Sequence, residues 1–230
     1  MAFEDIALPD VSGLTVGILG GTGEQGRGLA YRLARAGQQV TIGSRVNEKA
    51  TAVATDLSAL PHVPPGSINA GRNEDAAEQD VVIVAVPWAG HADLLTSLAT
   101  HLSGRIVVDC VNPLGFDKQG PFALRVEEGS AAQQAAALLP DSRVTAAFHH
   151  VSAVLLADPT IEEMDIDILV LGDDREAAAT VQALAGRIAG MRGVFGGRLR
   201  NAGQVEALTA NLIAINRRYK THAGVRVSGL

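Results

Sequence analysis

A single cysteine, Cys110, stands in the 230-residue sequence, so no disulfide can form within the chain. One unpaired cysteine fits a protein that works in the reducing cytoplasm, and we expect it to be a small buried hydrophobe rather than a redox thiol. Basic residues are too few to give a positive surplus, because 19 of them face 25 acidic residues, for a net charge of −6. Since nucleic-acid-binding proteins usually carry a basic surplus, we expect no nucleic-acid partner.

Long apolar runs are absent as well. No stretch approaches the roughly 20 apolar residues that a membrane-spanning helix needs, so we expect no membrane partner. Residues 1–13 hold three acidic residues and no basic start, which indicates a short arm rather than a signal peptide. Repeats, zinc-ligand spacings and GxSxG elbows are also missing. With 47% hydrophobic and 19% charged residues, the composition is typical of an ordinary soluble globular protein.

What the sequence does contain is a regular alternation of short apolar runs with helical patterns. Residues 14–20 form a continuous apolar run ending in glycines, as in a strand buried on both faces. Residues 27–36 then place apolar side chains at helical spacing, and further apolar runs occupy 40–43, 80–86 and 106–108. This alternation predicts a Rossmann-type α/β fold, in which helices cover both faces of a doubly wound parallel sheet.

The alternating pattern thins after residue 155. We expect a strand over 166–171, a helix over 174–189 and a final helix over 201–218. This tail is too short for a second doubly wound domain. We therefore predict an N-terminal arm over 1–13, a nucleotide-binding Rossmann domain over 14–155 and a small C-terminal α/β domain over 156–230.

A glycine-rich loop, GGTGEQG, follows the first expected strand and opens the first expected helix. Glycine at Gly20 and Gly23 permits a tight turn and a close approach of the backbone to a pyrophosphate. The helix N-terminus adds unpaired N–H groups and the positive end of a dipole. Because a strand, a helix and a second strand surround the motif at the required places, it favours a phosphate-binding loop over a structural glycine turn.

The end of the second expected strand indicates which dinucleotide binds. NAD enzymes usually have Asp or Glu there, whereas this chain has Ser44 and Arg45, with Lys49 one helical turn later. A hydroxyl and two cations attract a 2′-phosphate, and a guanidinium can hold it with two hydrogen bonds. The alternative is a solvated helix start, although cations are disfavoured at a helix N-terminus unless an anion is there. We therefore predict binding of NADP(H).

Several motifs, taken in order, carry a family resemblance. After LGGTGEQGRGLAYRLARAG and TIGSRVNEKA come NEDAAEQDVVIVAVPW, VVDCVNP, AAFHH and VEALTANLIAIN. From Leu14 onward the chain closely resembles the NADP-dependent oxidoreductases of coenzyme F420, an 8-hydroxy-5-deazaflavin. The resemblance implies that the glycine loop holds the pyrophosphate and the second strand end holds the 2′-phosphate, through Thr22, Gly23, Glu24 and Gln25 and through Ser44, Arg45 and Lys49.

The resemblance also implies a site for the reacting rings, which the C-terminal domain completes around the deazaflavin. His149 and Val151 match positions that press on the nicotinamide, and we take them as the catalytic residues. Trp88 stays open between packing and cofactor contact. No metal is expected, since His149 and His150 have no acidic or cysteine partner at ligand spacing. The same resemblance implies Ala92, Asn112 and Ala153 along the nicotinamide half. Val86, Pro87 and Val111 are expected near the reacting carbons because they follow strand ends.

The implied reaction is hydride transfer between NADP(H) and coenzyme F420 as co-substrate, which needs neither a nucleophile nor a metal. Two other functions stay open: an NADP-dependent reductase of an imine, ketone or flavin, for which no proton donor is evident, and a non-enzymatic NADP(H) sensor. Seven basic residues between 191 and 230 face only Glu206, and they either attract the anionic coenzyme tail or form a solvated surface. The family and an apolar stripe on the last helix favour a homodimer, the stripe being Val205, Leu208, Leu212 and Ile215.

Overall fold

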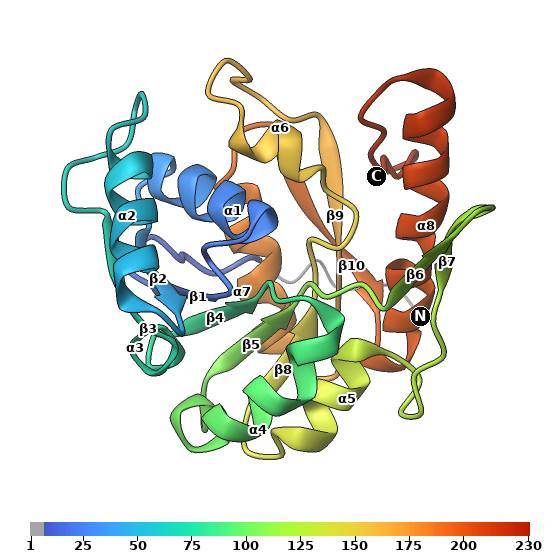
Figure 1. Cartoon of the computed structure of the whole chain (residues 1–230), viewed down its shortest axis with the longest axis horizontal. Coiled ribbons are helices and arrows are strands. Elements are labelled where there is room, and N and C mark those ends of the chain that lie inside the picture. The colour runs from blue at the N-terminus through green and yellow to red at the C-terminus, as the bar shows by residue number, and fades with distance from the viewer. Residues whose placement is uncertain (1–6) are drawn as a thin grey trace.

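The computed structural model describes residues 7–230, and its centre is an eight-stranded sheet (Figure 1). All neighbouring strands are parallel except β8 and β9, which pair antiparallel. The predicted Rossmann-type α/β fold is therefore confirmed. The strand order across the sheet is β3 (Ile68–Arg72), β2 (Gln39–Ser44), β1 (Thr15–Leu19), β4 (Val81–Val84), β5 (Ile106–Asp109), β8 (Arg143–Ala146), β9 (Ile166–Gly172) and β10 (Met191–Gly197).

Helices cover both faces of this sheet, as a doubly wound fold requires (Figure 1). One face carries α1 (Glu24–Arg35), α2 (Asn47–Ser58), α6 (Ala153–Ala157) and α7 (Arg175–Gly186). The other face carries α3 (Asn73–Ala77), α4 (His91–Leu102), α5 (Ala131–Leu138) and α8 (Ala202–Tyr219). Two 3-10 turns precede α4 and α8, η1 (Trp88–Gly90) and η2 (Leu199–Asn201). Within residues 7–230, none of these helices combines the length and the apolarity that crossing a membrane requires.

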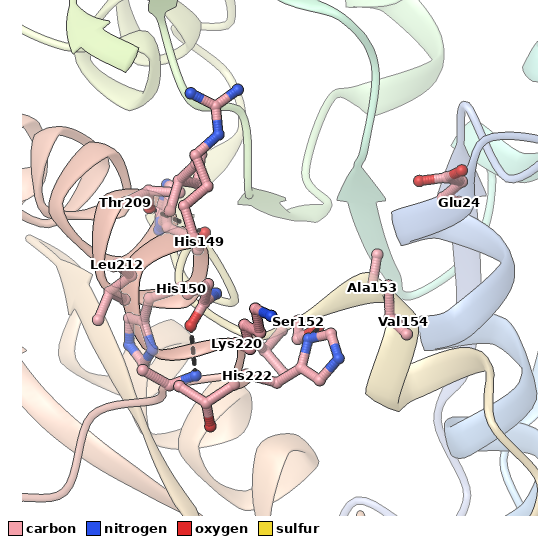
Figure 2. Close-up of a pocket in the computed structure, with 16 residues that line it drawn as sticks. Glu24, His149, His150, Ser152, Ala153, Val154, Thr209, Leu212, Lys220 and His222 are labelled. Carbon is pink, nitrogen blue, oxygen red and sulfur yellow. Dashed lines mark hydrogen bonds between the residues drawn. The ribbon is translucent and has the colours of Figure 1, made fainter. Parts of the chain in front are cut away.

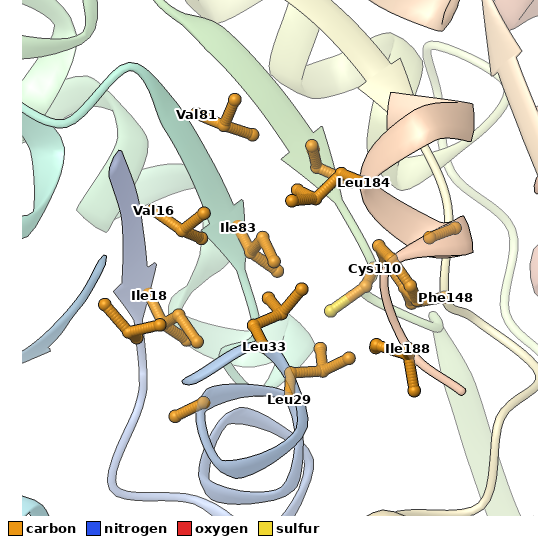
Figure 3. Close-up of a cluster of buried hydrophobic side chains, with 14 of the residues drawn as sticks. Val16, Ile18, Leu29, Leu33, Val81, Ile83, Cys110, Phe148, Leu184 and Ile188 are labelled. Atoms are coloured by element: carbon orange, nitrogen blue, oxygen red, sulfur yellow. The ribbon is translucent and has the colours of Figure 1, made fainter. Parts of the chain in front are cut away.

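The central strands are apolar on both sides because each side packs against a layer of helices. In β4, Val81 and Ile83 belong to the cluster beneath α1, whereas Val82 and Val84 belong to the cluster on the opposite face. Figure 3 shows Leu29 and Leu33 of α1 over the β1 and β4 side chains. Burial of each such side chain contributes about 1.5–3 kcal/mol, which explains the uninterrupted apolar runs in the sequence.

The C-terminal part of the chain extends the same sheet. β9 joins β8 through the antiparallel pairing of Leu171 with Ala146, and β10 adds to β9 in parallel. A separate antiparallel hairpin, β6 (Leu114–Asp117) and β7 (Gly120–Ala123), lies beside α8 (Figure 1). The division of the chain at residue 155 stays a prediction. The predicted arm over 1–13 lies partly outside the described residues.

Candidate functional site

The predicted site residues follow five adjacent strands that run in the same direction, β8, β5, β4, β1 and β2. Their carboxyl ends therefore meet at one edge of the sheet. From β1 the chain winds outward through β2 to β3, and from β4 it winds the other way through β5 to β8. The chain therefore reverses its winding direction between the neighbouring strands β1 and β4, which is a topological switch point. Ligands of such sheets bind outside the carboxyl ends of the strands at this point.

Glycine is required at some positions of the loop between β1 and α1 but not at others. Gly20 has a φ of +76°, and a Cβ there would lie 2.6 Å from the Ala85 carbonyl oxygen. A Cβ on Gly26 would lie 2.7 Å from the Gly20 carbonyl oxygen, so this glycine serves the packing of helix on loop. Gly23 has an ordinary φ of −81°, is exposed, and would place a Cβ no closer than 3.4 Å to another atom. The protein itself does not require glycine at Gly23, which leaves the space beside it for a ligand.

The N-terminus of α1 fits an anion. Gly23 is its N-cap and offers no side chain to the first-turn N–H groups, so these donors are left for another partner. Thr22 is half-buried and Glu24 is exposed at this helix start. The side-chain amide of Gln25 is engaged elsewhere, because it donates to the Phe148 carbonyl over 3.1 Å. This bond ties the loop to the end of β8.

The end of β2 presents the predicted 2′-phosphate residues together. Ser44 is buried, and its Oγ accepts a hydrogen bond from the Val46 N–H over 3.2 Å, which leaves its own O–H free to donate. Arg45 and Lys49 are exposed at the start of α2, and neither forms an ion pair with any residue of the described chain. Two unpaired cations at a helix N-terminus fit a phosphate bound between them.

The residues expected along the nicotinamide half follow β4 and β5. Val86 lies against the glycine loop, since a Cβ on Gly20 would come within 2.8 Å of its Cγ1. Trp88 is half-buried in η1, and its ring centroid lies 5.4 Å from that of His91. It packs against the apolar cluster of that face, so packing is part of its role. Of the other members, Pro87 is exposed, Ala92 is half-buried and Val111 is buried.

Asn112 joins the ends of two strands to the last helix. Its side-chain Nδ2 donates to the His149 carbonyl over 2.9 Å, and the Thr209 hydroxyl of α8 donates to the same carbonyl over 3.0 Å. The Thr209 hydroxyl also lies 3.3 Å from Asn112 Oδ1. These bonds fix the backbone that carries His149, and they occupy much of the Asn112 amide with protein partners.

The imidazole of His149 is buried without a partner. Only 3% of the residue is exposed, and neither ring nitrogen has a hydrogen bond within the described residues. Burial lowers the pKa of His149 to about 4, so its ring is neutral near pH 7 and has one donor and one acceptor to offer. A buried polar group without a partner costs about 1–3 kcal/mol. The ring therefore fits a site that a bound ligand completes.

His149 faces a cleft of about 660 Å³ (Figure 2). Of the predicted residues, Glu24, His149, Val151 and Ala153 line it, and the others lie outside it along the sheet edge. The opposite wall comes from α8 and the residues that follow it. Among these wall residues, Leu212 belongs to the predicted apolar stripe, and Arg217 and Lys220 belong to the basic C-terminal set. Thr209, Asn216 and His222 carry no signal of their own in the sequence and were missed.

A buried polar cluster lies at the carboxyl end of β5. His91 Nε2 lies 2.6 Å from Asp109 Oδ2, and Asp109 Oδ1 accepts from the Val111 N–H over 3.0 Å. Burial lowers the pKa of His91, but the hydrogen bond and charge of Asp109 outweigh it, so the net shift is upward. Glu206 of α8 accepts hydrogen bonds from the first two N–H groups of α5, and burial raises its pKa to about 7.

Cys110 and His150 are each held by a hydrogen bond to the backbone. The Cys110 thiol is buried, donates to the Val84 carbonyl over 3.0 Å, and has its pKa raised by burial, as expected for a small buried hydrophobe. His150 Nε2 accepts a hydrogen bond from the Leu169 N–H. Across residues 7–230, no three His, Cys, Asp or Glu side chains are grouped so as to hold a metal ion.

The parallel sheet, the glycine loop after β1 and the unpaired cations after β2 are typical of a dinucleotide-binding protein of the Rossmann class. Residues 15–113 match the family described as NADP oxidoreductase, coenzyme F420-dependent. F420-dependent NADP reductases of Methanothermobacter marburgensis and Methanocaldococcus jannaschii are each 36% identical to this chain, over 94% of it and 99% of the relative. An Arthrobacter crystal structure provisionally named as such a reductase is 28% identical, with a TM-score of 0.78 over 94% of this chain and 100% of its own. The chain belongs to the F420-dependent NADP reductase family.

Proposed function

We propose that this chain transfers a hydride between NADP(H) and coenzyme F420. The observation that carries the proposal is the neutral, unpartnered ring of His149, which stands where the dinucleotide edge of the sheet opens into the cleft. One ligand on the sheet edge and a second in the cleft would meet at this ring. Family membership over nearly the whole chain supports the same reaction.

The dinucleotide half of the proposal rests on the loop and on the β2 end. Residues 22–25 would hold the pyrophosphate through first-turn N–H groups, with the space beside Gly23 taken by the phosphates. Ser44 would donate its hydroxyl to the 2′-phosphate, and Arg45 and Lys49 would neutralise it. The lack of any carboxylate partner for these two cations within the described residues supports NADP(H) over NAD(H).

The ring half of the proposal assigns His149 and Val151 to the nicotinamide, with the strand-end residues Val86, Asn112 and Ala153 around it. NADP(H) and the deazaflavin bring their own hydride chemistry when bound. The protein then has to hold the two reacting carbons about 3–3.5 Å apart and keep water out. His149 would orient the nicotinamide by hydrogen bonding through a neutral ring, and it would move no proton. Residues 156–230 would complete the deazaflavin side.

We also propose a homodimer. Val205 and Leu212 of the predicted stripe are buried within their own chain, whereas Ile215 and Tyr219 are exposed at the far end of α8. Phe116 and Phe122 are exposed on the hairpin beside α8 (Figure 1). An apolar surface over two adjacent elements supports contact with a second copy. Light scattering coupled to size exclusion measures it, and a monomer at micromolar concentration would contradict it.

A cytoplasmic location is proposed on the chain's single cysteine, whose thiol is buried and reduced. The net charge of −6 supports the absence of a nucleic-acid partner, and family membership supports small-molecule cofactors as partners.

The deciding experiment mixes the protein with NADPH and oxidised coenzyme F420 and follows the absorbance of both. Deuterium placed on one face of nicotinamide C4 should then appear on C5 of the deazaflavin without loss to water. Reduction of an imine, ketone or flavin in place of F420 would indicate a different reductase. Binding of NADPH without turnover of any of these would indicate a sensor, and either result would overturn the proposal.

A further inference from the structure

The chain ends in a segment that turns back over the molecule, residues 220–230, which we call the C-terminal strap. α8 stops at Tyr219, and Lys220 takes a left-handed conformation with a φ of +51° that reverses the chain. Asn216 holds this reversal, because its side-chain oxygen accepts from the Ala223 N–H over 2.6 Å. The strap then runs beside β9, where the Asp167 N–H donates to the Val225 carbonyl over 2.8 Å.

One buried carboxylate anchors the strap. Asp167 lies on β9 with its side chain wholly buried, and it accepts four hydrogen bonds of 2.7–2.9 Å. Two come from the fork of Arg192 on β10, and two come from the strap itself, from the Arg226 side chain and the Val227 N–H. The hydrogen bonds from Arg192 hold the pKa of Asp167 well below its usual range, so the anchor stays charged at every pH where the protein would be assayed.

Further contacts fix the second half of the strap at close range. Arg192 also donates to the carbonyls of Val227 and Leu230. A Cβ on Gly224 would lie 2.6 Å from Cδ1 of Ile166, so any larger residue there would force the Ile166 side chain to shift. Residues 224–230 are therefore held by side chains of β9 and β10. In the strand order, these two strands lie at the opposite end of the sheet from β2 and β3.

The first half of the strap forms part of the cleft wall. Residues 220–223 line the cleft together with the 149–154 segment. His222 Nδ1 lies 3.2 Å from the Ser152 hydroxyl, and Figure 2 shows Lys220 and His222 next to Ser152, with Glu24 of α1 farther across the cleft. The strap is thus held at one end by the Asp167 anchor and touches the cleft with the other end.

We infer that Asp167, Arg192 and Arg226 form a positioning cluster that fixes the strap as a wall for the co-substrate in the cleft, without acting on the dinucleotide. The inference rests on the proposed function, with the deazaflavin as that co-substrate. The physical reason is pre-organisation, since a wall that is already ordered need not lose conformational entropy when the ligand binds. The residues proposed for the 2′-phosphate lie at the end of β2, toward the other end of the sheet edge. Because those phosphate contacts hold NADPH independently of the strap, the affinity for NADPH should change far less than that for the deazaflavin.

The test uses the full-length protein with Arg226→Ala, whose side chain is about half exposed and whose loss should not impair folding. Loss of one charge-assisted hydrogen-bonding partner predicts a rise of about 10-fold or more in the dissociation constant of oxidised deazaflavin, measured by fluorescence quenching. The dissociation constant of NADPH should stay within about twofold of the wild-type value. Arg226→Lys keeps the positive charge and should recover part of the loss. Asp167→Asn should weaken deazaflavin binding further where circular dichroism confirms its fold.

Hydrogen exchange gives a readout that needs no ligand. In Arg226→Ala the amides of Val227 and Asp167 should exchange faster, while those of the central strands keep their protection. Arg200→Ala removes an exposed arginine with no hydrogen bond or ion pair in the described chain, and it should change neither exchange nor binding. Equal weakening of both ligands, or unchanged deazaflavin binding in Arg226→Ala, overturns the positioning role while the proposed function stands. A wild-type protein that binds no deazaflavin overturns both.

Discussion

The side-chain amide of Asn112 donates a hydrogen bond to the backbone carbonyl of His149, over 2.9 Å, and so ties the end of β5 to the end of β8. The same carbonyl accepts from Thr209 of α8. The backbone of His149 is therefore fixed from two sides, while its ring has no partner. A fixed backbone with a free ring suits a residue that orients a ligand.

His149→Ala should lower turnover through misplaced ring geometry, since a shift of about 1 Å can cost roughly 100-fold in rate. The pKa of His149 is lowered to about 4 by burial, so the ring is already neutral across pH 5–8. The profile of kcat against pH over that range should keep its shape in the variant. His101→Ala on α4 serves as the control, because this half-buried histidine lies away from the cleft and pairs with Glu78. A titration near pH 6–7 that vanishes only in His149→Ala would mark the residue as an acid or base instead.

Arg45→Ala should raise the KM for NADPH by about 10- to 150-fold, because a charge-assisted hydrogen bond to phosphate contributes about 1.5–3 kcal/mol. The KM for NADH should hardly change, since NADH has no 2′-phosphate. Steady-state kinetics with both dinucleotides measures the difference, with the exposed Arg175→Ala of α7 as a matched control. Equal losses with both dinucleotides would indicate a structural role for Arg45.

Gly23→Ala and Gly26→Ala should fail in different ways. The Cβ on Gly23 meets protein only at 3.4 Å, so this variant should fold normally and lose NADPH affinity through collision with the pyrophosphate. The Cβ on Gly26 would lie 2.7 Å from one backbone atom and 2.8 Å from another, so this variant should lose thermal stability itself. Calorimetric binding and thermal unfolding separate the two effects. Tight NADPH binding by a folded Gly23→Ala would place the phosphates elsewhere.

Glu206→Gln should change how stability depends on pH. Burial raises the pKa of Glu206 from 4.5 to about 7, so folding favours its protonated form. Its contribution to stability is then fully present below about pH 4.5 and is lost as the pH rises through about 7, by up to about 3 kcal/mol. The glutamine variant lacks this titration, so its free energy of unfolding should rise relative to that of the wild type between about pH 4.5 and 7 and stay constant above that.

Urea unfolding of both proteins at several pH values measures this gain, and the exposed Glu127→Gln is the control. A wild-type-to-variant difference that does not vary with pH would contradict the raised pKa of Glu206.

Some elements could be predicted because their signals are local. The run before Gly20 became β1, and the stretches over 40–43, 106–108 and 166–171 became β2, β5 and β9 within one residue at each end. These strands are largely buried on both faces, so most of their residues are apolar. The strands β3, β8 and β10 escaped prediction, since INAGR, RVTA and MRGVFGG carry little apolar pattern. They become strands because a neighbour in the sheet supplies hydrogen bonds.

The sequence by itself determined where we predict the phosphates of the dinucleotide to bind. The glycine loop, the helix after it and the Ser44–Arg45 pair are contiguous in the chain, so residue type and spacing suffice to identify them. Tertiary structure alone decided that the His149 ring is buried without a partner, that α8 forms the far wall of the cleft, and that Asp167 meets Arg226. These features join residues that are far apart in sequence, and their burial depends on the whole sheet being assembled.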